Sequence, residues 1–168
     1  APQVHGPANE ALQKLYEVIF IELNSATDNP LIFADESESG PHEVVSGGNF
    51  HGEILGLVAD AMNAAVFELA SISERRMDTM LDASRSQLPA FLAADSGLES
   101  GMMIVQYAAA AAIADMRAHS RPHSTFSLST SANQEDHVSM AATAAWHLLE
   151  SSQRLADIMA CEAMIACE

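Results

Sequence analysis

The chain has 168 residues, 49% apolar and only 5% aromatic, which is enough for about one domain with a real core. Its formal net charge of −16 gives a surface that repels nucleic acid and anionic membranes, so we expect neither as a partner. Alanine and methionine supply much of the apolar content, which favours helix over sheet.

The first half of the chain predicts two helices with a loop between them. Apolar residues recur at helical spacing from about residue 9 to 25, and Pro30 then ends the pattern. The segment 34–48 is rich in Asp, Glu, Ser, Gly and Pro, which is typical of a variable surface loop. A second helix is expected from about 50 to 82, with this apolar face: Ile54, Leu57, Val58, Ala61, Ala65, Leu69 and Ile72.

The second half predicts two more helices, and no part of the chain has the pattern of a convincing strand. Ser96 and Glu99 have the spacing of a capping box, and the helix they would start is apolar on nearly every side, which predicts burial all round. The fourth helix is expected from about 134 to 166. Its apolar residues have the 3–4 spacing of a bundle seam: Val138, Ala141, Ala145, Leu148, Leu155 and Met159.

The length of these helices constrains the fold. A helix of about 30 residues is about 45 Å long, whereas a compact globule of this size has a radius of gyration of only about 15 Å. We therefore expect an all-α fold, an elongated bundle of about four long helices that forms a single segment over residues 1–168 and is buried further against other chains.

The two cysteines, Cys161 and Cys167, lie in the fourth predicted helix. Their separation corresponds to about 9 Å of helical rise, which is too far for a disulfide on one straight helix. Together with the lack of any stretch like a signal peptide, reduced thiols predict a cytoplasmic protein.

Two dense polar segments, 46–53 and 131–140, stand where predicted helices begin. Polar groups are costly to bury, so a cluster of them usually has a structural or a functional role. One interpretation is structural: Ser131 and Gln134 fit a capping box, and a glycine turn before Asn49 would place Phe50 against the core. The other interpretation is a functional site.

These two segments, with those at 24–31, 73–76 and 88–92, resemble the histidine ammonia-lyase branch of the aromatic amino acid lyase family. The run Ser-Ala-Asn-Gln-Glu-Asp-His-Val-Ser-Met is the most specific of them, and the resemblance extends over nearly the whole chain. It implies a homotetramer built round a large helical bundle, and elimination of ammonia from a small amino acid substrate, with L-histidine giving urocanate.

The resemblance also implies the site residues. Glu135 would contact the substrate side chain or serve in acid–base chemistry, and Phe50 would lie beside an electrophilic prosthetic group. The amides of Asn133 and Gln134 would orient neighbouring groups. Two further residues would lie near the substrate: Asn29 and His51.

The electrophile of this family, methylidene-imidazolone, forms from an internal Ala-Ser-Gly that this sequence does not contain. The Gln-Asp-x-Tyr-Ser-x-Arg segment, which supplies the catalytic base and the carboxylate-binding arginine, is also lacking. We therefore expect this chain to be the C-terminal part of a larger lyase, inactive until an upstream half completes it.

Some residues favour other functions. Phe126 stands where the resemblance predicts an acid, which leaves open a tyrosine or phenylalanine ammonia-lyase or an aromatic aminomutase. A non-catalytic helical oligomerisation module is a further alternative. No metal site is expected, because Arg121 and Pro122 break the helix that would align His119 with His123. The arginines at 75 and 76 are expected to form structural ion pairs.

Overall fold

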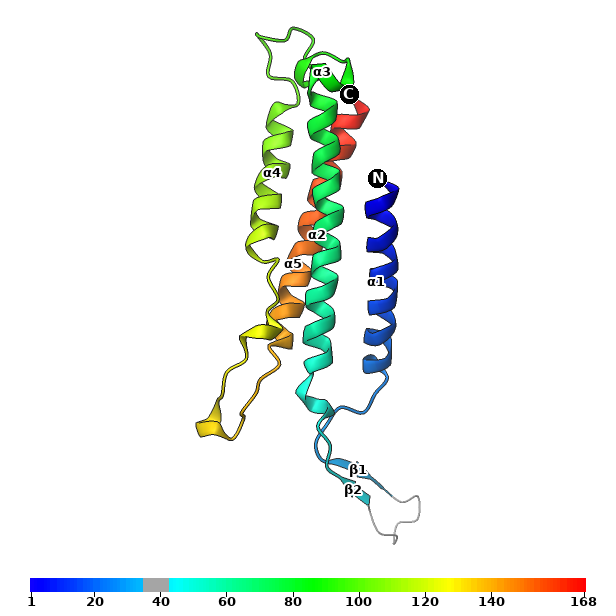
Figure 1. Cartoon of the computed structure of the whole chain (residues 1–168), viewed down its shortest axis with the longest axis vertical. Coiled ribbons are helices and arrows are strands. Elements are labelled where there is room, and N and C mark those ends of the chain that lie inside the picture. Colours follow the sequence, from blue (N-terminus) through cyan, green and yellow to red (C-terminus); the bar gives the residue numbers. More distant parts are fainter. Residues whose placement is uncertain (35–42) are drawn as a thin grey trace.

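The computed structural model describes residues 1–34 and 43–168. Its four long helices run along one another in an elongated bundle with irregular loops at both ends (Figure 1), so the predicted all-α fold is confirmed. The elements, in chain order, are α1 (Pro2–Leu23), β1 (Leu31–Phe33), β2 (Glu43–Val45), η1 (Asn49–His51), α2 (Glu53–Leu81), α3 (Ala83–Ser86), η2 (Ala90–Leu92), α4 (Met103–Ala118), η3 (Ser124–Phe126), η4 (Ser131–Asn133) and α5 (Ala141–Cys167).

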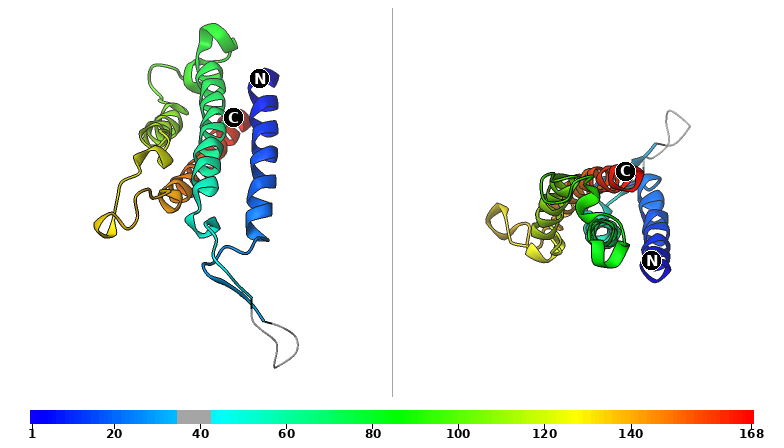
Figure 2. Two further views of the ribbon diagram at one scale, coloured as in Figure 1. Left: turned by 60° about the horizontal axis from the view of Figure 1, so that its bottom comes forward. Right: turned by 90° about the horizontal axis from the view of Figure 1, so that it is seen from above.

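The centre of the bundle is α2, which packs against α1, α4 and α5 (Figure 2). Its most buried stripe differs from the predicted one, because only Val58 and Ala65 of the seven expected residues are buried. The stripe is rich in small side chains, which let the neighbouring backbones approach closely. Its members are Gly56, Ala59, Asn63, Val66, Ala70, Ser73, Met77 and Leu81.

Helix α5 lies along α2 for much of its length and has a strict heptad of buried residues. These residues are Ala144, Ser151, Ile158 and Ile165. The predicted seam is correct for Leu148 and Leu155, which pack against the core, and wrong for Ala145 and Met159, which are exposed, Met159 at 55%. The observed repeat of seven is the pattern of a bundle seam.

Several predicted boundaries were wrong. Helix α1 begins at Pro2, because a proline in the first turn lacks only an N–H that would be unbonded anyway. Helix α4 begins at Met103 and not near Ser96, because Gly97 and Gly101 adopt positive φ and turn the chain. The segment expected to be a loop, 34–48, contributes β2, which pairs antiparallel with β1; residues 35–42 lie outside the described residues.

Much apolar surface stays exposed. The chain exposes 10646 Å², whereas a compact 17.9 kDa monomer exposes about 8,000 Å². Helix α4 was expected to be buried all round, but Ile104 and Tyr107 are 60% and 59% exposed. Apolar side chains also project from α1 and α5, among them Phe20, Leu23 and Trp146.

By length and composition alone, the segment Asn49–Leu81 is apolar enough to cross a membrane. The same segment contains α2, whose apolar residues pack against three other helices. A buried core helix has this composition for that reason.

The arginines at 75 and 76 form ion pairs, as predicted. Arg76 donates to Glu162 on α5, through Nη2 at 2.6 Å, and Ser73 donates to the same carboxylate at 2.5 Å. Arg75 donates to Glu74 at 2.6 Å. The hydrogen bond from Arg76 holds the pKa of Glu162 below its usual value of 4.5. A charged pair therefore links α2 to α5.

The lowered pKa of Glu162 predicts a loss of stability in acid. The carboxylate stabilises the folded chain above its unfolded pKa, and this contribution is lost as the pH falls through the lower folded value. Because Arg76 is 36% exposed, we expect Glu162→Gln to cost only about 1–2 kcal/mol at about pH 7 and much less at about pH 3. Urea unfolding followed by circular dichroism at both pH values measures this; Glu68→Gln, on the exposed side of α2, should show no such pH dependence. A cost of Glu162→Gln that is the same at both pH values would contradict the prediction.

Candidate functional site

A long irregular segment, residues 119–140, joins α4 to α5 and contains the predicted site residues Asn133, Gln134 and Glu135. Its first part is fixed to α2. The Asn63 side chain donates to the carbonyl of His119 at 2.9 Å, and the Asp60 carboxylate accepts the backbone N–H groups of His123 and Ser124, both at 2.9 Å. Burial, with His147 nearby, lowers the pKa of His123. The position of this part of the loop is therefore set by α2.

The last part of the loop approaches α2 at Gly56. A Cβ atom at position 56 would lie 2.9 Å from the carbonyl oxygen of Ser139 and 3.4 Å from the Cα atom of Ala141. Only glycine permits this approach without a shift of one backbone. The start of α5 is thus held directly against α2.

Gly56→Ala is therefore expected to push α2 and the 139–141 backbone apart and to destabilise the chain by about 1–3 kcal/mol. Gly6→Ala is the matched control, because nothing lies within 4 Å of its added Cβ atom and it occupies helix α1. The control should be neutral or stabilising by up to about 1 kcal/mol. Urea unfolding compares the two, and equal effects would show that the contact at position 56 is unimportant.

The tip of the loop is not the helix start that the sequence predicted. Ser131, Ala132 and Asn133 have φ values of 52°, 56° and 70°, in the left-handed region that non-glycine residues seldom adopt. The backbones of Thr130 and Glu135 pair with each other, with N···O distances of 2.9 and 3.3 Å. The predicted capping box of Ser131 is therefore wrong, and α5 begins ten residues later, at Ala141. The side chains at 133–135 are left exposed to solvent.

The two polar segments meet at His51 and His137. The Nε2 atom of His51 lies 2.7 Å from the carbonyl oxygen of His137, and their ring centroids are 5.7 Å apart. Glu53, the first residue of α2, places Oε2 3.8 Å from the Nδ1 atom of each ring. That oxygen is buried without a hydrogen-bond partner among the described residues. The structure thus joins segments 86 residues apart, through residues of which only His51 was predicted.

Asn29 forms hydrogen bonds that fix the backbone just before η1. Its Oδ1 atom accepts hydrogen bonds from the Ser46 hydroxyl at 3.0 Å and from the Gly47 backbone N–H at 3.1 Å. Asn49 donates to Glu22, at the end of α1, at 3.4 Å. Asn29 therefore orders the polypeptide that leads into Phe50 and His51.

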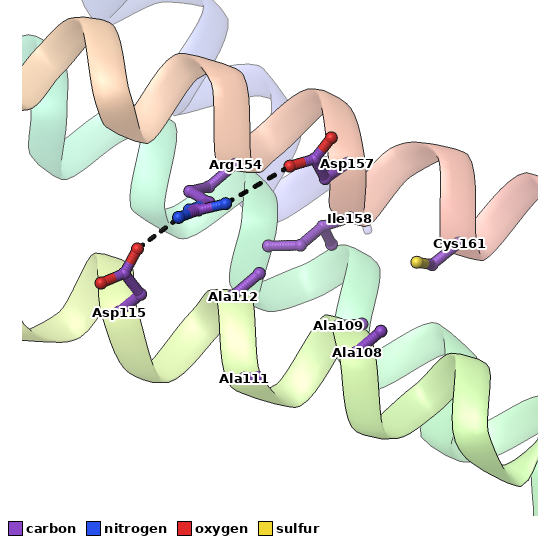
Figure 3. A pocket seen from close by; sticks show the side chains of 9 residues that line it. All are labelled: Ala108, Ala109, Ala111, Ala112, Asp115, Arg154, Asp157, Ile158 and Cys161. Carbon is purple, nitrogen blue, oxygen red and sulfur yellow. Dashed lines mark hydrogen bonds and ion pairs between the residues drawn. The ribbon is translucent and has the colours of Figure 1, made fainter.

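Phe50 and Glu135, two of the predicted site residues, both face solvent in this chain. Phe50 is 53% exposed in η1 and does not pack into the core. A cavity of about 490 Å³ lies between α4 and α5 instead, lined by alanines and by Arg154 between Asp115 and Asp157 (Figure 3). No predicted site residue lines it, and its charged groups pair with one another, at 2.9 and 3.7 Å.

The chain is 45% identical over 165 residues to the histidine ammonia-lyase of Caldanaerobacter subterraneus subsp. tengcongensis, covering 98% of this chain and 32% of that protein. It is 46% identical over 167 residues to the histidine ammonia-lyase of Rattus norvegicus, covering 99% and 25%. The chain thus spans about a third or less of the length of these relatives.

Solved structures show the same relationship. The crystal structure of histidine ammonia-lyase from Trypanosoma cruzi matches with a TM-score of 0.90 and 44% identity, over 99% of this chain and 32% of that one. The Pantoea agglomerans phenylalanine aminomutase matches with a TM-score of 0.89 and 36% identity, over 99% and 32%. The sequence model of the aromatic amino acid lyase family covers residues 1–168. The chain therefore belongs to the aromatic amino acid lyase family.

Proposed function

We propose that this chain forms part of an ammonia-lyase that eliminates ammonia from L-histidine to give urocanate. The observation that carries the proposal is the identity of 44–47% over nearly the whole chain to proteins named histidine ammonia-lyase. The contact between His51 and His137 supports it, because it gathers the two polar segments at one end of the bundle. Other polypeptide must complete the site, since Phe50 and Glu135 are open to solvent.

In this proposal Glu135 contacts the substrate. Its carboxylate accepts a hydrogen bond from the imidazole N–H of histidine, or relays a proton during the elimination. The amides of Asn133 and Gln134 orient groups around it. Asn29 and His51 have a positioning role, because their hydrogen bonds fix the segment before α2.

The exposed ring of Phe50 fits a flat prosthetic group beside it. Methylidene-imidazolone would supply the electrophile of the reaction, and its Ala-Ser-Gly precursor must come from outside this chain. Phe50 offers an apolar face, 53% exposed, against which a planar ring from other polypeptide can stack. Excluding water there is the role that we assign to Phe50.

We also propose that the enzyme is a homotetramer in the cytoplasm. The apolar surface on α1, α4 and α5 supports assembly, because contiguous exposed apolar patches are typical of interfaces. The free thiols of Cys161 and Cys167 support a reducing compartment.

The test is reconstitution with the polypeptide that contains Ala-Ser-Gly. Histidine should give the ultraviolet absorbance of urocanate, and this chain alone should be inactive. Phe126, 50% exposed on the same loop, favours an aromatic lyase or aminomutase as the second candidate. Phenylalanine and tyrosine are therefore assayed in parallel for cinnamates and β-amino acids. A complex inert toward all three amino acids refutes lyase and aminomutase alike and leaves an oligomerisation module.

A further inference from the structure

Three histidines form a stack between the end of α4 and the second turn of α5. The ring of His147 lies between the other two, with its centroid 4.3 Å from that of His119 and 4.1 Å from that of His123. The planes are nearly parallel, at 19° and 18°. All three residues are half-buried.

Two ring nitrogens of this stack are buried without a hydrogen-bond partner among the described residues. They are Nδ1 of His147 and Nε2 of His123. The Oε2 atom of Glu150 lies 3.3 Å from Nδ1 of His147, but the two atoms are not aligned as a hydrogen bond. Buried polar atoms in native proteins nearly always have a partner, so these nitrogens require an explanation.

The arrangement has the donor set of a transition-metal site. One ring nitrogen of His119, one of His147 and a carboxylate oxygen of Glu150 all lie within 4.8 Å of one another. With metal–ligand bonds of about 2.0–2.1 Å, tetrahedral donors lie about 3.3 Å apart, so side-chain rotations must bring the donor atoms up to about 1.5 Å closer. An imidazole nitrogen binds a metal in the plane of its ring, so His119 must also turn out of its stack on His147 before both nitrogens can bind one ion. His147 and Glu150 are three apart on α5 and therefore share one face of the helix.

The donor types narrow the choice of ion. Imidazole nitrogens with one carboxylate suit Zn²⁺, Co²⁺ and Ni²⁺, whereas Mg²⁺ and Ca²⁺ prefer oxygen ligands alone. Asp115 lies beside the site, with Oδ1 3.9 Å from Nε2 of His119, and it also accepts a hydrogen bond from Arg154 at 2.9 Å. A carboxylate in this place can orient a metal-bound imidazole.

We propose that His119, His147 and Glu150 bind a divalent transition-metal ion of the Zn²⁺ class, which ties the end of α4 to α5. The ring of His123, stacked on His147, positions that ligand. The bound ion would join the two helices between which the Glu135 loop runs. It would therefore stabilise the loop without taking part in the proposed elimination. This site is absent from the sequence-based expectation, which considered His119 with His123 and not with His147.

The test is a Zn²⁺ titration of the full chain, purified without a histidine tag and stripped of metal, in competition with a chelating dye. We expect one Zn²⁺ per chain, and binding at least about tenfold weaker in His119→Ala, His147→Ala and Glu150→Gln. Co²⁺ should give the visible absorption of a tetrahedral complex. Zn²⁺ should also slow cleavage of the 120–140 loop by a protease.

The comparison variant is His137→Ala, which alters the other group of histidine and glutamate side chains, His51, Glu53 and His137. It should bind Zn²⁺ as the unmodified chain does. Circular dichroism checks that each variant keeps its helices, and His119→Ala, at the very end of α4, serves if His147→Ala does not fold. The proposal is overturned if the chain binds no stoichiometric Zn²⁺, or if His137→Ala loses binding that His119→Ala retains.

Discussion

Glu135→Gln is expected to lower kcat of the completed enzyme about 10²–10⁴-fold, with little change in the helix content or the assembly of the complex. Glutamine has the shape of glutamate but carries no charge and cannot relay a proton. Because residue 135 lies on an exposed loop tip, outside the helices, the substitution removes no packing contact from the bundle. The loss should therefore be one of chemistry and not of folding.

The neighbouring residue provides the control for this substitution. Asp136→Asn removes the same charge one position away, on the same exposed segment, and we expect it to keep kcat within about threefold. Steady-state kinetics on histidine compare the two variants, and gel filtration checks assembly. If Glu135→Gln turns over as fast as Asp136→Asn, Glu135 has no catalytic role.

Met77→Ala is expected to have the largest effect on stability, with a loss of about 2–5 kcal/mol. Met77 is 0% exposed on α2 and belongs to the core cluster that includes Met116, Ile158 and Ile165. Truncation to alanine removes three heavy atoms from a site enclosed by several helices, and the backbones cannot all move to fill the cavity.

The same substitution at an exposed methionine shows whether the loss of stability comes from burial or from the residue type. Met164 is 55% exposed on α5, so Met164→Ala should change the free energy of unfolding by less than about 0.5 kcal/mol. Urea unfolding of both variants measures the difference. Comparable effects at the two positions would mean that the core does not have the packing described.

Helical periodicity predicted the scaffold well. The segments now seen as α2 and α5 were recognised from apolar spacing, and Leu148 and Leu155 were placed correctly on the packed face. The buried stripe of α2 was missed because half of its members are glycine, alanine or serine and one is asparagine, and such residues give a weak apolar signal. Close helix packing gives such small residues their burial.

The ends of the helices were harder to predict. Ser131 with Gln134, like Ser96 with Glu99, has the spacing of a capping box, yet neither pair starts an α-helix. The left-handed backbone of Ala132 and Met140 carries no signature in their side chains, unlike that of Gly97 and Gly101.

Local patterns also gave no information on which distant residues meet. The resemblance to the family identified Glu135, Phe50 and the other predicted site residues, and their roles stay predictions. The partnership of Glu53 with His137, and the stacking of His147 between two histidines, are tertiary contacts over long sequence separations. Only the packing of α2 and α5 against the loop brings these residues together.

The attachment of the 119–140 loop to α2 bears on how such proteins diverge. Both ends of the loop are fixed within about two turns of one helix, at Gly56, Asp60 and Asn63, whereas the side chains at 133–135, at its tip, are exposed to solvent. Mutations can therefore accumulate at the tip while the scaffold keeps its fold. In a lyase of the kind proposed, changes at the tip would alter what the loop presents without requiring a new core.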